Sequence, residues 1–351
     1  MSNANGNLAQ TNQIASALSK RIFNHQTNEF EEKFNRLPFP VSHNLAGHPL
    51  FELPRLVELA KFLWTLAGHK VVFQEGGAAF ADRWDEIPTK ALSFIKGINE
   101  IQDSNSWVLL KSVQEDPEYQ ACLDLFVAEL SELTNVDLKK EITWIDGYVF
   151  IASPGAVTPH HIDHESNFLL QIHGDKNLNV CDPGDRSVLF EEEIESYYAG
   201  DLSAAAFKSV SQEKAYVFPM KPGTGAHIPS KGPHWVRNGD DYSISFSINF
   251  CMRKTDVKSR VYQCNHYLRK LDFAPTPPGQ SAIKDWVKIM ALARLGKSKS
   301  ANKYELLRQN LKRLDGISRV AGKVLRRPTH PDLDTVKGDE EHSRRKYNER
   351  Y

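Results

Sequence analysis

The chain is poor in cysteine, carries no net charge and lacks long apolar runs. Its 351 residues include four cysteines, and no two of them have the short spacing of a zinc knuckle or a disulfide framework: Cys122, Cys181, Cys251 and Cys264. We therefore expect free thiols in a reducing compartment. Lys plus Arg and Asp plus Glu both number 44, so no overall electrostatic field draws the protein onto nucleic acid or a membrane.

We expect neither a targeting segment nor a membrane anchor. The N-terminal stretch MSNANGNLAQTNQ has no apolar signal core. No apolar run approaches the roughly 18–20 residues that a bilayer-spanning helix needs. We see no internal repeat. These absences predict a cytoplasmic protein that makes no use of a membrane.

Composition and the spacing of apolar residues divide the chain into five parts. We expect a flexible polar N-terminus over 1–30, a mixed α/β region over 31–146, a β-rich core over 147–255, a helical region over 256–326 and a disordered tail over 327–351. Apolar spacing predicts helices from Leu53 to Leu66 and after Asp116-Pro117. Strands are expected at 70–74 and 107–112.

The expected core consists of short apolar runs separated by Gly, Pro and Asp, which is typical of an all-β sandwich or barrel. We predict strands at 148–152, 160–172, 177–181, 215–219, 225–228, 234–237 and 242–251. The last strand alternates: Tyr242, Ile244, Phe246 and Ile248 share one face, and Ser243, Ser245, Ser247 and Asn249 share the other. By itself this pattern fits a half-buried strand with its serine face in water. Beside the motif described next, we favour a polar interior.

One short motif points to chemistry. Thr158-Pro159-His160-His161-Ile162-Asp163 places a histidine and a carboxylate two residues apart, and more histidines follow downstream. Two histidines and one carboxylate form the ligand set of a mononuclear iron site with open positions. In a continuous strand His161 and Asp163 would point the same way and His160 the opposite way. The second histidine could be His227 or His234; we favour His234, which follows a Gly-Pro turn.

The stretch TPHHIDHESNFLLQIHGDK also resembles a known family. It is similar to the core of the JmjC and cupin-like hydroxylases that use Fe(II) and 2-oxoglutarate, among them the asparaginyl hydroxylase of hypoxia-inducible factor. The family pattern is T-P-x-H-x-D, then N-F, then Q-I-x-G-x-K. This sequence supplies the matching residues Thr158, Pro159, His161, Asp163, Asn167, Phe168, Gln171, Ile172, Gly174 and Lys176.

The resemblance implies an α+β fold: a double-stranded β-helix (jelly-roll, cupin-like) core with N-terminal α/β elements and C-terminal helices. It implies that Fe(II) is bound by His161, Asp163 and His234. Lys176 would meet the distal carboxylate of 2-oxoglutarate with help from Thr158, and Asn167 and Asn249 would lie near this cosubstrate. It further implies a hydroxyl group from an earlier strand, which we expect within 107–112.

The implied activity is hydroxylation of a peptide, a protein side chain or a small metabolite, with dioxygen and 2-oxoglutarate consumed and succinate and CO2 released. In the family, helices after the barrel form a homodimer; Leu307, Leu311 and Leu314 could serve here. The basic stretch 294–327 could bind nucleic acid, but we favour a solvated surface.

Two other readings stay open. A cupin isomerase, or a dioxygenase that does not use 2-oxoglutarate, commonly has more histidine ligands, and Asp163 argues against it. A non-catalytic cupin-like binding or regulatory protein would not need the three ligands, so their presence argues against that reading.

Overall fold

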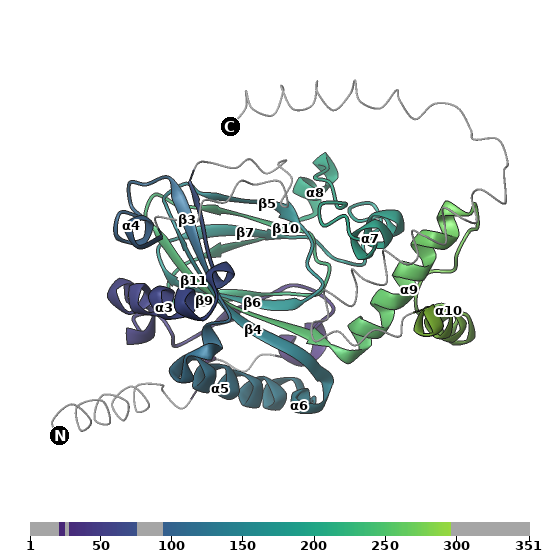
Figure 1. Ribbon diagram of the computed structural model, residues 1–351, viewed down its shortest axis with the longest axis horizontal. Helices are drawn as coiled ribbons and strands as arrows, with labels where there is room; N and C mark the ends of the chain where they lie inside the picture. The colour runs from purple at the N-terminus through teal and green to yellow at the C-terminus, as the bar shows by residue number, and fades with distance from the viewer. Residues whose placement is uncertain (1–20, 25–27, 76–93, 296–351) are drawn as a thin grey trace. The chain divides into compact units, whose positions relative to one another are not determined.

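A computed structural model describes residues 21–24, 28–75 and 94–295, which fall into two units (Figure 1). The first unit runs to Tyr197 and resumes from Asp201 to Ser259; the second holds Tyr198–Gly200 and the chain from Arg260. The expected disordered tail, Leu307, Leu311, Leu314 and all but the first two residues of the basic stretch lie outside the described residues.

Two antiparallel sheets make the centre of the first unit (Figure 1). The seven-stranded sheet has the order β1-β9-β6-β11-β4-β3-β2, and the four-stranded sheet has the order β5-β10-β7-β8. The strands are β1 Phe39–Ser42, β2 Val71–Glu75, β3 Ser106–Lys111, β4 Ile142–Ala152, β5 Val157–His161, β6 Ser166–His173, β7 Lys176–Val180, β8 Tyr216–Met220, β9 Thr224–Ile228, β10 His234–Asn238 and β11 Ser243–Met252. The predicted α+β fold with a jelly-roll core is confirmed.

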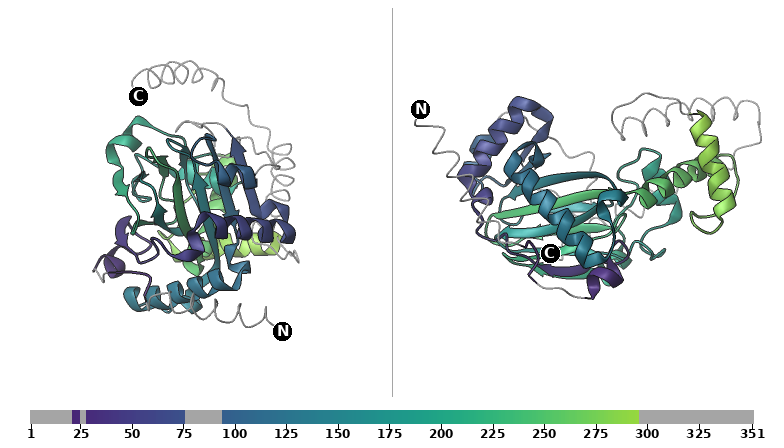
Figure 2. Two further views of the ribbon diagram at one scale, coloured as in Figure 1. Left: turned by 90° about the vertical axis from the view of Figure 1, so that its left-hand side faces the viewer. Right: turned by 90° about the horizontal axis from the view of Figure 1, so that it is seen from below.

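Helices cover the outer face of the seven-stranded sheet, as the views in Figure 2 show. The helices of the first unit are α2 Glu29–Lys33, α3 Leu53–Leu66, α4 Phe94–Asn99, α5 Pro117–Thr134, α6 Leu138–Glu141, α7 Glu191–Tyr198 and α8 Ser209–Lys214, with single 3-10 turns at Pro49–Phe51, Gly68–Lys70 and Val113–Glu115. Helix α5 begins as predicted. The Asp116 carboxylate accepts a hydrogen bond of 3.0 Å from the Glu118 amide, which satisfies one of the unpaired amides of the first turn.

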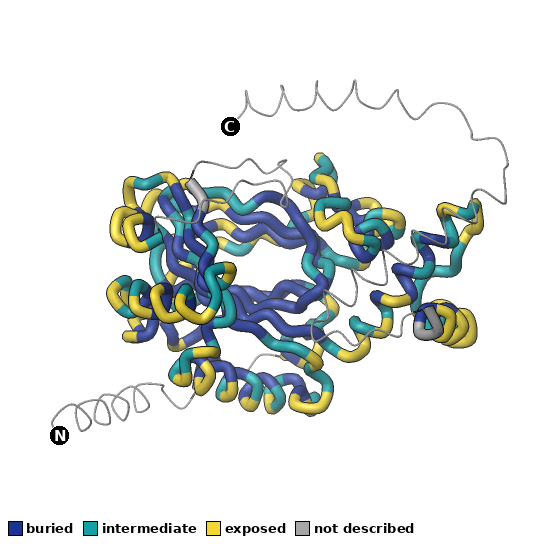
Figure 3. The backbone as a smooth tube through the Cα atoms, viewed as in Figure 1, coloured by how far each residue is buried: buried dark blue, intermediate teal, exposed yellow. Residues whose placement is uncertain are grey.

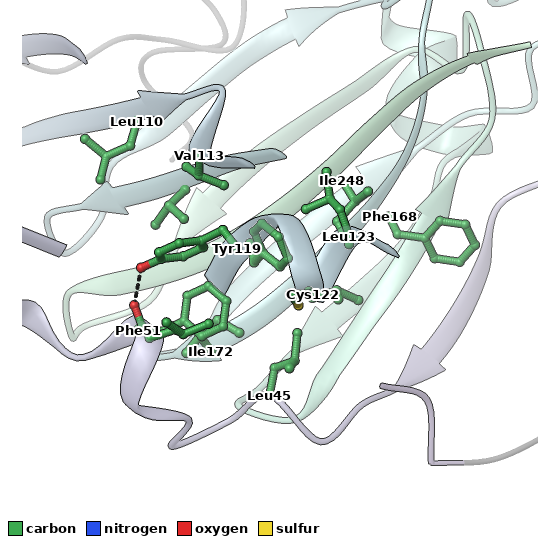
Figure 4. Packing of buried hydrophobic residues seen from close by; sticks show 14 of the residues in the cluster. Leu45, Phe51, Leu110, Val113, Tyr119, Cys122, Leu123, Phe168, Ile172 and Ile248 are labelled. Atoms are coloured by element: carbon green, nitrogen blue, oxygen red, sulfur yellow. Dashed lines mark hydrogen bonds between the residues drawn. The ribbon is translucent and has the colours of Figure 1, made fainter. Parts of the chain in front are cut away.

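The main hydrophobic core lies between α5, α3 and this outer face (Figure 4). Leu123 and Phe126 of α5 pack with Phe168 of β6 and Phe246 of β11, all of them at most 1 % exposed. The Tyr119 hydroxyl in the same core donates a hydrogen bond to the Leu50 carbonyl, so its buried oxygen is satisfied. This core fixes β6 and β11, the central strands of the larger sheet.

Strand β11 shows how the alternating sequence sorts its side chains. Ile244, Phe246, Ile248 and Phe250 enter the hydrophobic core. On the opposite face, which turns toward the four-stranded sheet, Ser245 and Ser247 are fully buried and Asn249 is 5 % exposed. Figure 3 shows that the central strands are mostly buried. The serine face is therefore buried, as we favoured from the sequence, and the interior between the sheets is polar on this side.

The predicted strand 160–172 is wrong in one respect, because two strands occupy this range. Strand β5 ends at His161 and β6 begins at Ser166, and the two belong to different sheets. Residues 162–165 cross from one sheet to the other. Asp163 therefore lies in this crossing loop, and the strand-parity argument does not apply to it.

The second unit is helical. It contains most of α9 (Arg253–Lys270) and all of α10 (Ala282–Leu295). Within it, the rings of Tyr198 and Tyr262 stack at 5.6 Å, and the Lys288 ammonium donates to the Thr276 carbonyl at 2.7 Å. None of the described helices combines the length and the apolar character that crossing a bilayer requires.

Candidate metal and cosubstrate site

Three side chains that the sequence analysis singled out meet between the two sheets, at one end of the faces that the sheets turn toward each other. His161 ends β5, His234 begins β10, and these two residues are paired across the four-stranded sheet. Their rings lie 4.1 Å apart between centroids. The Asp163 Oδ2 atom lies 3.6 Å from the His161 Nε2 atom and 3.7 Å from the His234 Nε2 atom. Three ligand atoms at such separations can all bind one metal ion.

His161 and His234 are both held in the tautomer that metal binding requires. The Nδ1 atom of His161 donates to the Pro159 carbonyl at 2.8 Å, and the Nδ1 atom of His234 donates to the Gly232 carbonyl at 2.9 Å. With the proton on Nδ1, the lone pair of Nε2 is directed toward Asp163. Backbone carbonyls in this role orient metal-binding histidines and raise their basicity.

The charges at the site suit a divalent cation. Burial disfavours ionisation of Asp163, but the neighbouring His161 and His234 outweigh it and lower the pKa of this carboxyl to about 2. Burial, assisted by His161, lowers the pKa of His234 to about 4. The Asp163 carboxylate and neutral His234 are therefore in the forms that bind metal at neutral pH. Burial opposes protonation of His161, but the Asp163 carboxylate outweighs it and raises the pKa of His161, so a bound cation would displace that proton.

A bulge in the pairing of β5 and β10 places Thr158 on the inner face as well. His161 pairs with His234, whereas Thr158 pairs with Val236, so β5 has one extra residue between the two pairs. Directly opposed residues of paired strands point to the same face. Thr158 and His161 therefore share the inner face although three positions separate them.

Lys176 lies on the same sheet, farther from the three ligands. Lys176 and Val180 are the two ends of β7, and they pair with Asn238 and His234. A separation of four residues along a strand corresponds to roughly 13 Å. The long lysine side chain and a five-carbon dicarboxylate together can span this distance to the ligand set.

The Lys176 ammonium group has no partner among the described residues. The residue is only 7 % exposed, and burial lowers its pKa to about 7. Neither a hydrogen bond nor an ion pair involves this ammonium group in the described part of the chain. An unpaired buried charge is costly, so this position favours an anionic ligand.

Asn167 and Asn249 pair across β6 and β11 and bind each other. The Asn167 amide donates to the Asn249 Oδ1 atom at 2.7 Å and to the Ser247 hydroxyl at 2.6 Å. The Asn167 Oδ1 atom is buried and has no partner among the described residues. The pair is thus a largely satisfied network on the inner face of the larger sheet, opposite the sheet that carries the metal ligands.

A residue that the sequence analysis missed also faces this interior. Tyr148 of β4 pairs with Ser247 of β11, which places both on the inner face. Burial raises the pKa of Tyr148, and the nearby carboxylates of Asp146, Glu165 and Asp163 raise it further. We expected the hydroxyl of an earlier strand within 107–112; Tyr148 on the neighbouring strand is the better candidate. Only the pairing of β4 with β11 reveals this.

His227, the alternative candidate for the second histidine ligand, uses both ring nitrogens in hydrogen bonds to the main chain. Its Nδ1 atom donates to the Asn167 carbonyl at 3.0 Å, and its Nε2 atom accepts from the Asn35 amide at 3.0 Å. Its ring lies 4.6 Å from that of Phe168. His227 is thus a satisfied core residue, and both of its nitrogens are used within the protein.

His160 lies apart from the three ligands. Its ring packs against Phe207 and Trp235, at 5.6 and 5.5 Å between centroids. Its Nδ1 atom donates to the Ala205 carbonyl at 3.1 Å. His160 therefore points away from Asp163, as we expected, but into the apolar cluster beneath the 182–215 segment and not into water.

The acidic run at 191–195 forms the start of α7, and its side chains are already engaged. Glu191 and Glu193 make ion pairs of 2.5 Å with Arg186 and Lys208, and Glu195 is 1 % exposed. These contacts make the run part of the folded 182–215 segment.

The sequence is similar to that of a curated protein. A Jumonji C domain-containing protein 5 of Drosophila melanogaster is 22 % identical over 205 residues, which cover 53 % of this chain and 48 % of the relative. The chain thus spans about half the length of that relative. No protein-family profile matches the chain. The similarity to a Jumonji C protein confirms the resemblance inferred from the TPHHID stretch.

Solved structures of similar overall arrangement include a ribosomal oxygenase, YcfD, from Escherichia coli. One structure covers 88 % of this chain and 68 % of that chain at 13 % identity, with a TM-score of 0.44. Another, a complex with cobalt and 2-oxoglutarate, covers 84 % and 72 % at 16 % identity, with a TM-score of 0.41. The metal and the 2-oxoglutarate belong to that enzyme.

Proposed function

We propose that this chain, a relative of JmjC-domain proteins, is an Fe(II)- and 2-oxoglutarate-dependent oxygenase. One observation carries the proposal: the inner face of one small sheet bears two of three facial metal ligands at one end and a buried, unpaired ammonium group at the other. A metal-binding group at one end and a cation at the other are complementary to a 2-oxo acid with a second carboxylate.

The three ligands would hold Fe(II). His161, Asp163 and His234 offer two nitrogens and one oxygen from a single side, which leaves three positions for a bidentate 2-oxo acid and dioxygen. Bound Fe(II) would supply oxidation of a C–H bond coupled to decarboxylation of 2-oxoglutarate.

The other residues would position the cosubstrate and exclude water. Lys176 would pair with its distal carboxylate, and Thr158 would add a hydroxyl group from the same inner face. Tyr148 is a further candidate for this contact from the larger sheet. The Asn167–Asn249 pair would shape the wall nearest the reacting end.

The substrate would be a peptide, a protein side chain or a small metabolite, with succinate and CO2 as co-products. The competing cupin isomerase or 2-oxoglutarate-independent dioxygenase would leave Lys176 buried without a function. A non-catalytic binding protein would not require imidazoles fixed in the metal-binding tautomer. A cytoplasmic location stays a prediction from the sequence.

Anaerobic spectroscopy tests the proposal. Purified protein is mixed with Fe(II) and 2-oxoglutarate without oxygen, and we expect the weak visible charge-transfer band of iron chelated by a 2-oxo acid. His161→Ala should abolish the band by loss of iron. Lys176→Met should retain iron but need about 100-fold more 2-oxoglutarate, the equivalent of a lost buried ion pair.

Matched controls make the outcome decisive. His173, at the end of β6, forms an ion pair with Asp241 and is 41 % exposed in its side chain, so His173→Ala should leave the band unchanged. Lys111 faces the same interior from the larger sheet, where it pairs with Tyr148, and Lys111→Met should shift 2-oxoglutarate affinity much less than Lys176→Met. If the wild-type protein binds iron but gives no band with 2-oxoglutarate, the proposed function is wrong.

We also propose that the C-terminal helices mediate a homodimer. Within the described residues, α10 exposes an apolar face with helical spacing: Ile283, Trp286, Val287 and Met290, at 78, 62, 53 and 37 %. Light scattering should give the mass of a dimer for the wild-type protein and of a monomer for Trp286→Glu. A monomeric wild-type protein would rule the dimer out.

A further inference from the structure

A second group of metal-binding side chains lies beside the site described above. His164 follows Asp163 in the loop between the sheets, Cys251 lies near the end of β11, and Asp256 lies in the first turns of α9. Their ligand atoms, one from each residue, all lie within 4.8 Å of one another. His164 is 7 % exposed and Cys251 is 3 % exposed. Three different metal-binding groups from three elements thus converge in a buried place.

Hydrogen bonds from neighbouring groups fix the orientation of the Asp256 side chain, as is common for metal ligands. The Thr143 hydroxyl donates to the Asp256 Oδ2 atom at 2.6 Å, and the Oδ1 atom lies 2.9 Å from the His164 Nε2 atom. A hydrogen bond to one carboxylate oxygen fixes the direction of the other. Oδ1 and the His164 Nε2 atom are joined by a hydrogen bond, and a bound cation would take the place of the shared proton.

The backbone of His164 is fixed on both sides. Its amide donates to the Tyr197 hydroxyl at 3.1 Å, and its carbonyl accepts from the Ser230 hydroxyl at 2.7 Å. A ligand whose main chain is held in this way loses little freedom on binding an ion, so the entropic cost of closing the site is small.

We propose that His164, Cys251 and Asp256 bind a divalent cation of the zinc class. Thiolate, imidazole and carboxylate are all zinc ligands, with bonds of about 2.0–2.3 Å. A tetrahedral ion with such bonds keeps its ligand atoms roughly 3.3–3.7 Å apart, so the widest pair would close by about 1.5 Å at most. The hydrogen-bonded pair of Oδ1 and Nε2, at 2.9 Å, would open slightly. A buried thiolate beside a carboxylate is unfavourable alone, whereas a divalent cation makes the three-ligand site neutral.

The bound ion would tie the crossing loop to the junction of β11 and α9. Asp163 of the proposed iron site lies directly before His164, so the ion would also restrain this loop. The proposal does not rest on the oxygenase function, because none of its three ligands belongs to the iron site.

Cobalt spectroscopy separates the two sites, because only the second contains sulfur. The metal-free full-length protein is titrated with Co(II) without oxygen, and we expect an intense near-ultraviolet band from thiolate to cobalt at one equivalent. The double variant His161→Ala/His234→Ala, which lacks the iron site, should keep this band. Zinc added afterwards should displace cobalt and bleach it.

Variants of the second site decide the assignment. Cys251→Ser should abolish the band, whereas Cys264→Ser, a cysteine of the second unit, should retain it. Thr143→Val leaves all three ligands in place and should weaken cobalt binding by about 10-fold or more through loss of the supporting hydrogen bond. An identical spectrum and metal count for the wild-type protein and Cys251→Ser would overturn the proposal. If Cys251→Ser does not fold, Asp256→Asn serves instead. An unchanged cobalt affinity of Asp256→Asn would also overturn the proposal.

Discussion

His227 in β9 and His234 at the start of β10 are close in sequence and both buried, yet their ring nitrogens have different partners. Both nitrogens of His227 are bound to main-chain groups, and aromatic rings surround it. His234 uses one nitrogen for the Gly232 carbonyl and directs the other toward Asp163. Burial lowers the pKa of both, to about 3 and about 4.

The comparison teaches that burial and a perturbed pKa do not identify a functional histidine. The informative quantity is the hydrogen-bonding capacity that remains after the protein has used its own partners. His161 and His234 each direct one nitrogen toward Asp163, and the Lys176 ammonium group has no partner among the described residues. These are the three residues that we propose bind an external ligand. His227 and Asn249 belong to the group whose needs are met internally.

The largest expected contrast concerns iron. His234→Ala should weaken Fe(II) binding by about 1000-fold, more than the 10- to 100-fold typical of residues that only support a ligand. His227→Ala should leave Fe(II) affinity within a few-fold of wild type. Anaerobic equilibrium dialysis measures both. Equal iron loss in the two variants would break the distinction between them.

The order of the two variants should be reversed for stability: His227→Ala should lower the free energy of unfolding more than His234→Ala. His227→Ala removes a packed ring and takes a hydrogen-bond partner from the Asn35 amide and from the Asn167 carbonyl. We expect the free energy of unfolding to fall by about 3–5 kcal/mol. His234→Ala should cost clearly less in the metal-free protein, because its Nε2 atom has only the neighbouring ligands to lose. Urea denaturation of metal-free samples makes the comparison.

The pH dependence should single out Lys176. Its folded-state pKa of about 7 lies below the ordinary value of 10.5, so between these values the unfolded chain binds more protons. The free energy of unfolding of metal-free wild type, relative to Lys176→Met, should therefore rise with pH from about 7 to 10 by up to about 1.4 kcal/mol per unit. The opposite slope, or none, would mean that the ammonium group is already paired.

Asn249 should give the smallest effect. Its side chain accepts from Asn167 and Ser247, so Asn249→Ala should cost about 1–2 kcal/mol of stability. Affinity for 2-oxoglutarate should fall by only about threefold, because the residue shapes the wall and carries no charge. A loss as large as that of Lys176→Met would place Asn249 with the ligand-binding group.

Local pattern was enough to predict several features of the fold. The alternation from Ser243 to Asn249 predicted a strand with two different faces, and Asp116-Pro117 predicted the start of α5. Such signals depend on strand period and helix capping, which act over a few residues. The break after His161 was not predictable in this way, because residues 160–172 read as one continuous run. The break arises because β5 and β6 pair with different partners.

The sequence by itself determined the chemical types at the site: two imidazoles, a carboxylate and a lysine within a jelly-roll pattern. Only the tertiary structure decided that His234 and not His227 joins His161 and Asp163, that Tyr148 faces the interior, and that Lys176 is buried without a counter-charge. The physical reason is that a side chain's remaining hydrogen bonds and charges depend on which distant strands lie beside it. That pairing is a property of the whole sheet and not of any short segment.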